Sequence, residues 1–285
     1  MEQTQTPDYP RYASILVSVD LTPEAEARIR LAGLLAQTCS SHLIGVAAED
    51  VPVPLFSGLP GAGEPSAVQL EQGQAFHDLR EAAALFRKTA SMCKSVEWQQ
   101  GFEFKRGFAT QFVARQARAA DLVVVGQQGS SDPNGRQMSV DAATLVLTAG
   151  RPVLVVPSGK DNLTAERIVV AWKDTPEARR AVADSLPLLR RAQKVFVVSA
   201  GSDAEEQGGD EVIAYLGRHE VRAEVVLKPR PAGTVADELL DIARQRQADL
   251  IVCGAYGHSR AHELVFGGVT RDLMRASPVC CLMSH

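Results

Sequence analysis

A glycine-rich stretch near the end of the chain has the residue types and the spacing that bind an anion. Gly254 and Gly257 follow a short apolar run, and Gly267 and Gly268 come just before an expected helix. A strand, a glycine-rich loop and a helix N-terminus together present backbone N–H groups to an anion. The stretch lacks the Gly-Lys-Ser/Thr of a P-loop and the Gly-x-Gly-x-x-Gly of dinucleotide folds. The competing interpretation is therefore that these glycines only form turns and bind no ligand.

The composition limits the class of protein that this chain can be. It has 285 residues, of which 45% are hydrophobic and 22% charged, with a net charge of −4. That is typical of a soluble globular protein with one large or two ordinary domains. There is no excess of basic residues that would indicate nucleic-acid binding. There is also no apolar run long enough for a membrane span and no signal-peptide pattern at the N-terminus. Five cysteines without framework spacing predict free thiols in a cytoplasmic protein.

An internal repeat organises the chain. Three segments recur in the same order in both halves: 12–25 with 167–178, 120–129 with 248–257, and 151–156 with 277–282. The repeat predicts a first domain over residues 1–158 and a second over 166–285. The polar stretch between them has a proline and a glycine near its start, as is typical of a short linker.

Each copy alternates apolar runs with helical patterns. Continuous runs of Val, Ile and Leu indicate strands covered on both faces, and therefore a parallel sheet with helices on both sides. We expect the α/β fold class, with two tandem doubly wound parallel-sheet domains that pair with each other inside the chain. We expect each half to form its own sheet, and not one sheet continuous through both. Ligands in such folds bind beyond the carboxyl ends of the strands.

The chain resembles the universal stress protein family in its tandem two-domain form, which has an adenine nucleotide alpha hydrolase-like fold. The resemblance rests on a Thr-Pro-Glu-Ala after the first strand of each half, on an Ala-Asp-Leu run before each Gly-x-x-Gly, and on the terminal Pro-Val strands. Many members bind ATP through a motif of Gly, two residues, Gly, nine residues, Gly, then Ser or Thr. Gly254, Gly257 and Gly267 match that spacing, whereas Gly268 replaces the hydroxyl residue.

The resemblance implies a site for ATP or a related adenine nucleotide in the second domain. Lys173 stands where the family's first strand ends in Asp, and Thr270 is the nearest substitute for the missing hydroxyl. Trp172 is either a stacking partner for the base or a buried structural side chain. The residues implied at the site are Ala171, Trp172, Lys173, Ala200, Cys253, Gly254, Gly257, Gly267, Gly268, Val269 and Thr270.

The first domain departs from the motif in a different way. It keeps Asp20 at the end of the first strand, together with Gly126 and Gly129, but the position of the third glycine holds Ser139 between two larger apolar residues. Side chains at that place obstruct the approach of a phosphate to the backbone. We interpret this domain as a degenerate copy that does not hold a triphosphate and that pairs with the second domain.

Three functions stay open at this point. The first is a regulatory module that binds nucleotide in its second domain, the second is an interaction scaffold whose nucleotide site has decayed, and the third is a slow nucleotide hydrolase. We predict no catalytic residue and no metal ligand, because neither a base nor a ligand set is identifiable, and His258 and His262 alone make a poor metal site. A homodimer stays open, as does the role of the Pro- and Gly-rich segment 51–67.

Overall fold

A computed structural model describes residues 11–52, 67–127, 138–231, 233–256 and 268–285. The first half contains β1 (Ser14–Ser18), α1 (Ala25–Cys39), β2 (His42–Asp50), α2 (Ala67–Thr89), β3 (Val96–Glu103), α3 (Phe108–Gln116), β4 (Leu122–Gly126), α4 (Ala142–Thr148) and β5 (Val153–Val156). The second half contains β6 (Arg167–Ala171), α5 (Pro176–Leu189), β7 (Lys194–Ala200), α6 (Gly209–Arg218), β8 (Ala223–Lys228), α7 (Val235–Arg246), β9 (Leu250–Gly254), α9 (Val269–Ala276) and β10 (Cys280–Ser284). Short 3₁₀ turns follow α2 and α3 and precede α6.

The helices begin where the sequence supplies capping residues. At the start of α5, Thr175 Oγ1 accepts a hydrogen bond from the backbone N–H of Ala178, and Pro176 occupies the first helical position. At the start of α7, Thr234 and Asp237 form a reciprocal capping box. These side chains satisfy N–H groups that have no partner inside the helix, and they fix the point at which each helix begins.

The ten strands form one sheet, in the order β3-β2-β1-β4-β5-β10-β9-β6-β7-β8. Within each half the five strands are all parallel, which confirms the predicted α/β fold class. The expectation of a separate sheet in each half is wrong, because β5 and β10 pair with each other in antiparallel register. Each half would otherwise end in an exposed edge strand, and the pairing removes both edges from solvent.

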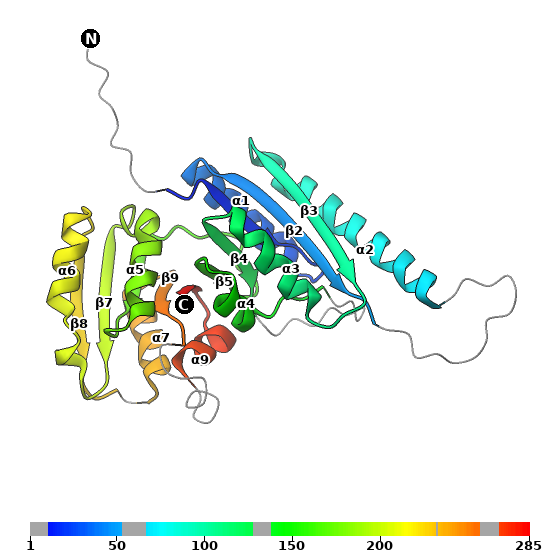
Figure 1. The fold of residues 1–285 in the computed structure, drawn as a ribbon. Helices are drawn as coiled ribbons and strands as arrows, with labels where there is room; N and C mark the ends of the chain where they lie inside the picture. Colours follow the sequence, from blue (N-terminus) through cyan, green and yellow to red (C-terminus); the bar gives the residue numbers. More distant parts are fainter. Residues whose placement is uncertain (1–10, 53–66, 128–137, 232, 257–267) are drawn as a thin grey trace, which may run out of the picture.

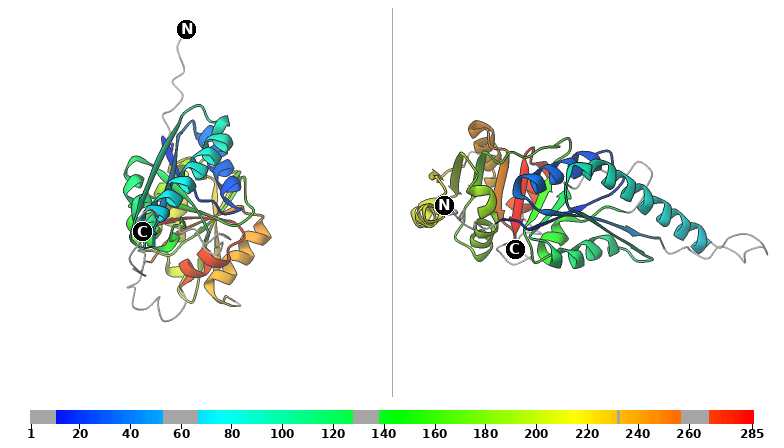
Figure 2. Two further views of the ribbon diagram at one scale, coloured as in Figure 1. Left: turned by 90° about the vertical axis from the view of Figure 1, so that its right-hand side faces the viewer. Right: turned by 90° about the horizontal axis from the view of Figure 1, so that it is seen from above.

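Figure 1 shows β3 and α2 at one end of this sheet and β8 and α6 at the other, with the C-terminus near the middle. Figure 2 shows the strands flanked by helices on both sides. One apolar layer is shared by α1, α2, α5 and α6, and the layer on the opposite face is shared by α3, α4, α7 and α9. Both layers run through both halves, so the halves bury a common core as well as sharing a sheet.

Polar contacts also join the two halves. The hydroxyl of Tyr12 in the first half donates to the carbonyl oxygen of Asp184 on α5 at 2.8 Å. Within the second half, the carboxylate of Asp184 accepts from Ser284 Oγ at 2.7 Å. Near the strand ends, the side-chain amide of Gln127 donates to the carbonyl oxygen of Ser277 at 3.1 Å. These bonds fix the orientation of the second half against the first at two separate places.

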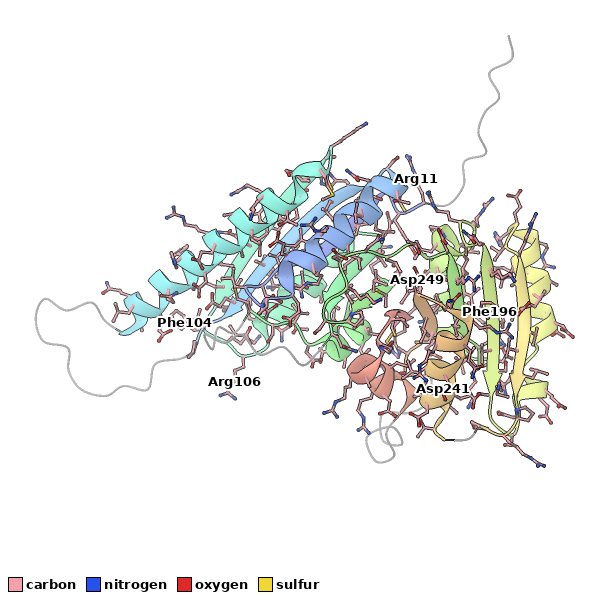
Figure 3. The ribbon with its side chains drawn as sticks, turned by 180° about the vertical axis from the view of Figure 1, so that it is seen from behind. Arg11, Phe104, Arg106, Phe196, Asp241 and Asp249 are labelled. Atoms are coloured by element: carbon pink, nitrogen blue, oxygen red, sulfur yellow. The ribbon has the colours of Figure 1, made fainter. Side chains whose placement is uncertain are left out.

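The repeated Ala-Asp-Leu run has a structural role in both halves. Asp121 Oδ2 accepts hydrogen bonds from the backbone N–H groups of residues 13–14, at 2.8 and 3.0 Å. Asp249 Oδ2 does the same for residues 164–165, at 3.0 and 2.8 Å. Each aspartate ties down the chain just before the first strand of its half, and Figure 3 labels Asp249 at the amino end of β9.

Among the helices that the structure describes, none has both the length and the apolar character required to cross a membrane. The five cysteines are free thiols, and four of them are buried, with Cys93 partly exposed. Burial raises the pKa of each thiol, to about 12 for Cys280 and Cys281. The thiolate is the reactive form of cysteine. Burial therefore slows the reaction of these side chains with thiol reagents in two ways, by limiting access and by keeping the thiols protonated.

We predict that the native protein has one slowly reacting thiol and that the unfolded protein has five. Cys93 is the partly exposed one, and burial raises its pKa, so Ellman's reagent at pH 8 should modify it more slowly than a free thiol. Cys93→Ser should abolish the native reaction. Recovery of fewer than five thiols under denaturing, non-reducing conditions would reveal a disulfide and contradict the prediction.

Candidate functional site

The second half contains a pocket at the carboxyl ends of its parallel strands. Its cavity volume is about 210 Å³, and we call it the second-half pocket. Strands β6, β7 and β9 supply its base, and α7 and α9 supply its sides. The described lining residues are Ala171, Trp172, Lys173, Thr175, Ala178, Val198, Ala200, Val235, Leu239, Cys253, Gly254, Tyr256, Val269 and Thr270.

The structure brings together most of the residues that the sequence predicted for a nucleotide site. Eight of them line the second-half pocket: Ala171, Trp172, Lys173, Ala200, Cys253, Gly254, Val269 and Thr270. Gly268 is the N-cap of α9, immediately beside the pocket. Gly257 and Gly267 lie outside the described residues, as do His258, His262, Gly129 and most of segment 51–67.

Gly254 permits a close backbone approach, but the neighbour is a helix of the protein itself. A Cβ atom at this position would lie 2.5 Å from the backbone nitrogen of Ala178 and 2.7 Å from the carbonyl carbon of Glu177. Both atoms belong to the start of α5, so the absence of a side chain lets α5 pack onto the end of β9. Gly254 is therefore required for the packing that forms the wall of the pocket.

Among the described residues that line the second-half pocket, one is charged. This residue is Lys173, and its side chain is exposed. The neighbouring Asp174 does not line it. The carboxylate of Asp174 accepts two hydrogen bonds from the guanidinium of Arg179, at 2.6 and 3.0 Å, and its backbone N–H donates to Gln207 Oε1 at 2.8 Å. These bonds hold the carboxylate of Asp174 in an exposed ion pair with Arg179, outside the lining of the pocket.

Trp172 is mainly a structural side chain, and it also forms one wall of the second-half pocket. It is 7% exposed, and its indole N–H donates to the carbonyl oxygen of Gln207 at 2.6 Å. The ring belongs to the apolar layer on the α5 side and also borders the second-half pocket. The interpretation of Trp172 as a buried structural side chain is confirmed, and stacking on a base stays a prediction.

The N-terminus of α9 faces the pocket without a capping side chain. Its N-cap is Gly268, with φ −73° and ψ 150°, and the first turn contains Val269 and Thr270. The first N–H groups of any α-helix have no intrahelical partner, and they carry the positive end of the helix dipole. At α9 no N-cap side chain takes up these donors. The arrangement is the physical basis of an anion site.

Several residues of this pocket were not predicted from the sequence. Val198, Val235 and Leu239 add apolar walls, and their strand and helix are far from the glycine motif in sequence. Tyr256 was missed although it lies inside the motif. Its φ of 58° is in the left-handed region, which is unfavourable for a bulky side chain and concentrates at functional sites.

A second and larger cavity lies at the carboxyl ends of the strands in the first half. Its volume is about 490 Å³, and we call it the first-half pocket. It is lined mainly by polar and charged side chains. The described lining residues are Ser18, Asp20, Thr22, Glu24, Arg28, Asp50, Gly107, Thr110, Gly126, Gln127, Ser139, Val140, Asp141, Val156, Pro157, Ser158 and Lys160.

A buried ion pair forms one wall of the first-half pocket. Arg28 is 4% exposed, and its guanidinium donates to Asp20 Oδ2 at 2.7 Å and to the carbonyl oxygen of Ser18 at 2.9 Å. Burial by itself would raise the pKa of Asp20, but the charge of Arg28 and hydrogen bonds from Thr22 and Arg28 outweigh it and lower that pKa. Arg28 also fills the space over Gly126, where a Cβ atom would lie 2.5 Å from Nη1.

Carboxylates cap α3 and α4, two of the helices that begin at the first-half pocket. Asp50 accepts from the backbone N–H groups of Gly107 and Ala109 at the start of α3, and Asp141 accepts from the N–H of Thr144 at the start of α4. Asp141 is thus the structural counterpart of Gly268. It follows Gly126 by fifteen residues, whereas Gly268 follows Gly254 by fourteen, so a match on spacing alone aligns Val140 with Gly268 and misses the cap.

Other chemistry is sparse around the second-half pocket. No carboxylate or histidine is among its described lining residues. One group of described side chains, His77, Asp78 and Glu81 on α2, has atoms close enough together to hold a metal ion, and none of the three lines either pocket. The arrangement can bind a ligand, and the described residues provide no base for hydrolysis.

Comparison with known proteins gives a family and a fold. The model of the universal stress protein family matches residues 164–285. A universal stress protein from Archaeoglobus fulgidus DSM 4304 has a similar structure, with a TM-score of 0.63, 16% identity and 95% of both chains covered. A functionally unknown protein from Pseudomonas aeruginosa PAO1 gives a TM-score of 0.57 at 17% identity, covering 96% of this chain and 92% of the other. No curated protein matches by sequence.

We predict that alanine is tolerated worse at Gly254 than at Gly126. The added Cβ at Gly254 meets backbone atoms of α5, which can move only with the helix, so the free energy of unfolding should fall by about 1–3 kcal/mol. At Gly126 it meets the end of the Arg28 side chain, which can shift, so the loss should be smaller. Urea denaturation of both variants measures the difference, and equal losses would contradict it.

We also predict that Asp20→Asn lowers the free energy of unfolding by about 3 kcal/mol at pH 7, because Arg28 stays buried without its counter-charge. The pKa of Asp20 is lowered by folding. Its stabilisation is therefore complete above the unfolded value of about 4 and is lost as the pH falls through the lower folded value. Urea titrations should show a deficit that shrinks as the pH falls below about 4. Asp174→Asn, in an exposed pair, is the control and should change stability by less than about 1 kcal/mol at either pH.

Proposed function

Because this chain belongs to the universal stress protein family, with the family match on residues 164–285, we propose that its second domain binds one adenine nucleotide, ATP or a relative, as a regulatory module. The nucleotide would occupy the second-half pocket. Binding there would change the stability and the surface of the second domain, and partner proteins would bind the nucleotide-bound and nucleotide-free forms differently. We also propose a cytoplasmic location, where free thiols remain reduced.

The walls of the second-half pocket suit a planar base. Most of its described lining residues are apolar, including Val198, Val235 and Leu239, and the indole of Trp172 forms one side. Small residues at the strand ends, Ala171 and Ala200, leave room at the base of the cavity. Apolar walls with a few polar groups are typical of small-molecule sites, because burial supplies affinity and the polar groups set orientation.

Two features of the second-half pocket with positive charge, Lys173 and the N-terminus of α9, support a binding site for the phosphate groups of the nucleotide. Lys173 carries the charge among the described lining residues, and a lysine ammonium is a common phosphate ligand. The N–H groups at the start of α9 face the same cavity, beside Gly268 and Thr270. A phosphate there gains hydrogen bonds and the favourable end of the helix dipole.

The observation that carries the proposal is the difference between Gly268 and Asp141. The same position of the repeat is an uncapped glycine in the second half and a capping carboxylate in the first. A phosphate at the first position would meet N–H groups that no N-cap side chain occupies, whereas a phosphate at the second would meet a carboxylate that already accepts from the N–H of Thr144. This asymmetry supports one nucleotide per chain, although the first-half pocket is the larger cavity.

The other two candidate functions have less support. A slow hydrolase needs a base or a metal-binding carboxylate, and the described lining of the second-half pocket has neither. A scaffold with a decayed site is distinguished by mass spectrometry of denatured, freshly purified protein, because a binding module should carry nucleotide and a scaffold should not.

We predict that calorimetry with ATP, ADP and AMP gives one site per chain for the nucleotide that binds best. Gly268→Asp copies the first half into the second, and it should abolish binding while leaving the protein folded, because aspartate is a good N-cap. Lys173→Met should weaken binding about tenfold or more through loss of a charged contact.

The matched control is Asp141→Gly, which makes the reverse change in the first half and should leave this site unaltered. Two equivalent sites per chain would show that the nucleotide is not confined to the second domain. Binding that survives Gly268→Asp would show that the phosphate lies elsewhere.

A further inference from the structure

Lys173 lies in a short turn at the edge of the second-half pocket. Strand β6 ends at Ala171 and α5 begins at Pro176, so residues 172–175 connect them. The ammonium group of a lysine is carried on a flexible four-carbon stem, so its position depends on how firmly the backbone beneath it is held. The hydrogen bonds that hold this turn therefore affect any anion that Lys173 contacts.

The first repeat fixes the same turn from within. Asp20 is the counterpart of Lys173 in the repeat, and its Oδ1 accepts from the backbone N–H and the hydroxyl of Thr22, at 3.1 and 2.6 Å. A lysine side chain has donors and no acceptor, so Lys173 cannot close the second turn in this way. There the matching N–H, that of Thr175, donates to the carbonyl oxygen of Lys173 at 2.7 Å. The second turn thus needs a side-chain acceptor from elsewhere in the chain.

Gln207 supplies this acceptor from the connection between β7 and α6. Its Oε1 accepts from the backbone N–H of Asp174 at 2.8 Å. Its backbone carbonyl oxygen accepts from the indole N–H of Trp172 at 2.6 Å. The two bonds hold the residues on either side of Lys173, so one residue of the β7–α6 connection fixes both ends of the segment that carries the lysine.

The side-chain amide of Gln207 is itself held in one orientation. Its Nε2 donates to Oδ2 of Asp203 at 2.8 Å and to the carbonyl oxygen of Asp203 at 3.3 Å. A carboxylate only accepts and a backbone N–H only donates, so the amide nitrogen must face Asp203 and the amide oxygen must face Asp174. Gln207 is half-buried, which reduces competition from water for these bonds.

We propose that Gln207 is a positioning residue of the second-half pocket, which holds the turn that presents Lys173 to the phosphate groups of the nucleotide. The inference rests on the nucleotide binding proposed above. Gln207 does not line the second-half pocket. It lines a neighbouring cavity of about 540 Å³ that shares the Trp172 wall. It therefore acts through the backbone of the turn, and its effect belongs to the phosphate end of the ligand.

The test is calorimetry of the full chain with ATP, ADP, AMP and adenosine. Gln207→Ala removes the acceptor for the Asp174 N–H and keeps the backbone carbonyl that holds Trp172. We expect the affinity for the nucleotide that binds best to fall about threefold to tenfold, as for the loss of one hydrogen bond. Adenosine has no phosphate and should bind with unchanged affinity. In a Lys173→Met background, Gln207→Ala should cause no further loss, because the group that it positions is gone.

A charge-matched pair of substitutions gives a rescue. Gln207→Glu puts a second carboxylate oxygen opposite the carboxylate of Asp203, so it should weaken nucleotide binding at least as much as Gln207→Ala. Adding Asp203→Asn places an amide donor opposite the new carboxylate and restores the net charge of the natural chain. The double variant Q207E/D203N should therefore recover most of the lost affinity.

The matched control is Gln37→Ala. It removes a 2.7 Å hydrogen bond from the side-chain amide of Gln37 to the carbonyl oxygen of Met92, and neither residue lines the two strand-end pockets. This variant should bind nucleotide with unchanged affinity, although it too loses a glutamine that joins distant parts of the chain.

Three results would overturn the positioning role. They are an unchanged nucleotide affinity in Gln207→Ala, an equal loss for nucleotide and adenosine, and additive losses with Lys173→Met. Absence of nucleotide binding by the natural chain would instead contradict the proposed function from which this role follows, so the two failures are distinguishable. If Gln207→Ala fails to fold, as judged by circular dichroism, the comparison of Gln207→Glu with Q207E/D203N decides the outcome.

Discussion

The antiparallel pairing of β5 with β10 is the contact on which the architecture depends. The register Cys281–Val155, Leu282–Leu154 and Met283–Val153 joins two five-stranded parallel sheets into one. Because the last strand of each half is the one that pairs, both halves lose an exposed edge, and both apolar layers become continuous across the junction. The chain therefore folds as a pair of repeats that complete each other.

This pairing also relates the two pockets. Both open at carboxyl ends of parallel strands, and the antiparallel junction sends the strands of the two halves in opposite directions. Helices α4 and α9 begin at the two pockets and contact each other near the junction. Gln127 lines the first-half pocket and donates to the carbonyl oxygen of Ser277, the residue that ends α9. A direct hydrogen bond thus runs from one pocket to the helix that borders the other.

Charge, more than volume, distinguishes the two cavities. The larger one has capping carboxylates at the starts of α3 and α4 and an Arg28–Asp20 ion pair, whereas the smaller one has Lys173 and a glycine as the N-cap of α9. A single position of the repeat is glycine in one half and aspartate in the other, and it adds a carboxylate to the first-half pocket alone. Duplicated frames can in this way keep one fold and diverge in the ligand they accept.

The sequence by itself determined the repeat, the α/β class and most of the lining of the second-half pocket, because buried parallel strands have continuous apolar runs and glycine motifs follow them directly. Only the tertiary structure decided that the two sheets are one, since strand pairing between repeats leaves no local pattern. It also decided that α5 packs against Gly254, and that Asp141 is the N-cap counterpart of Gly268 where spacing alone aligns Val140. Those features depend on which backbone lies opposite and on where a helix begins after a loop of different length, and spacing along the chain does not fix either.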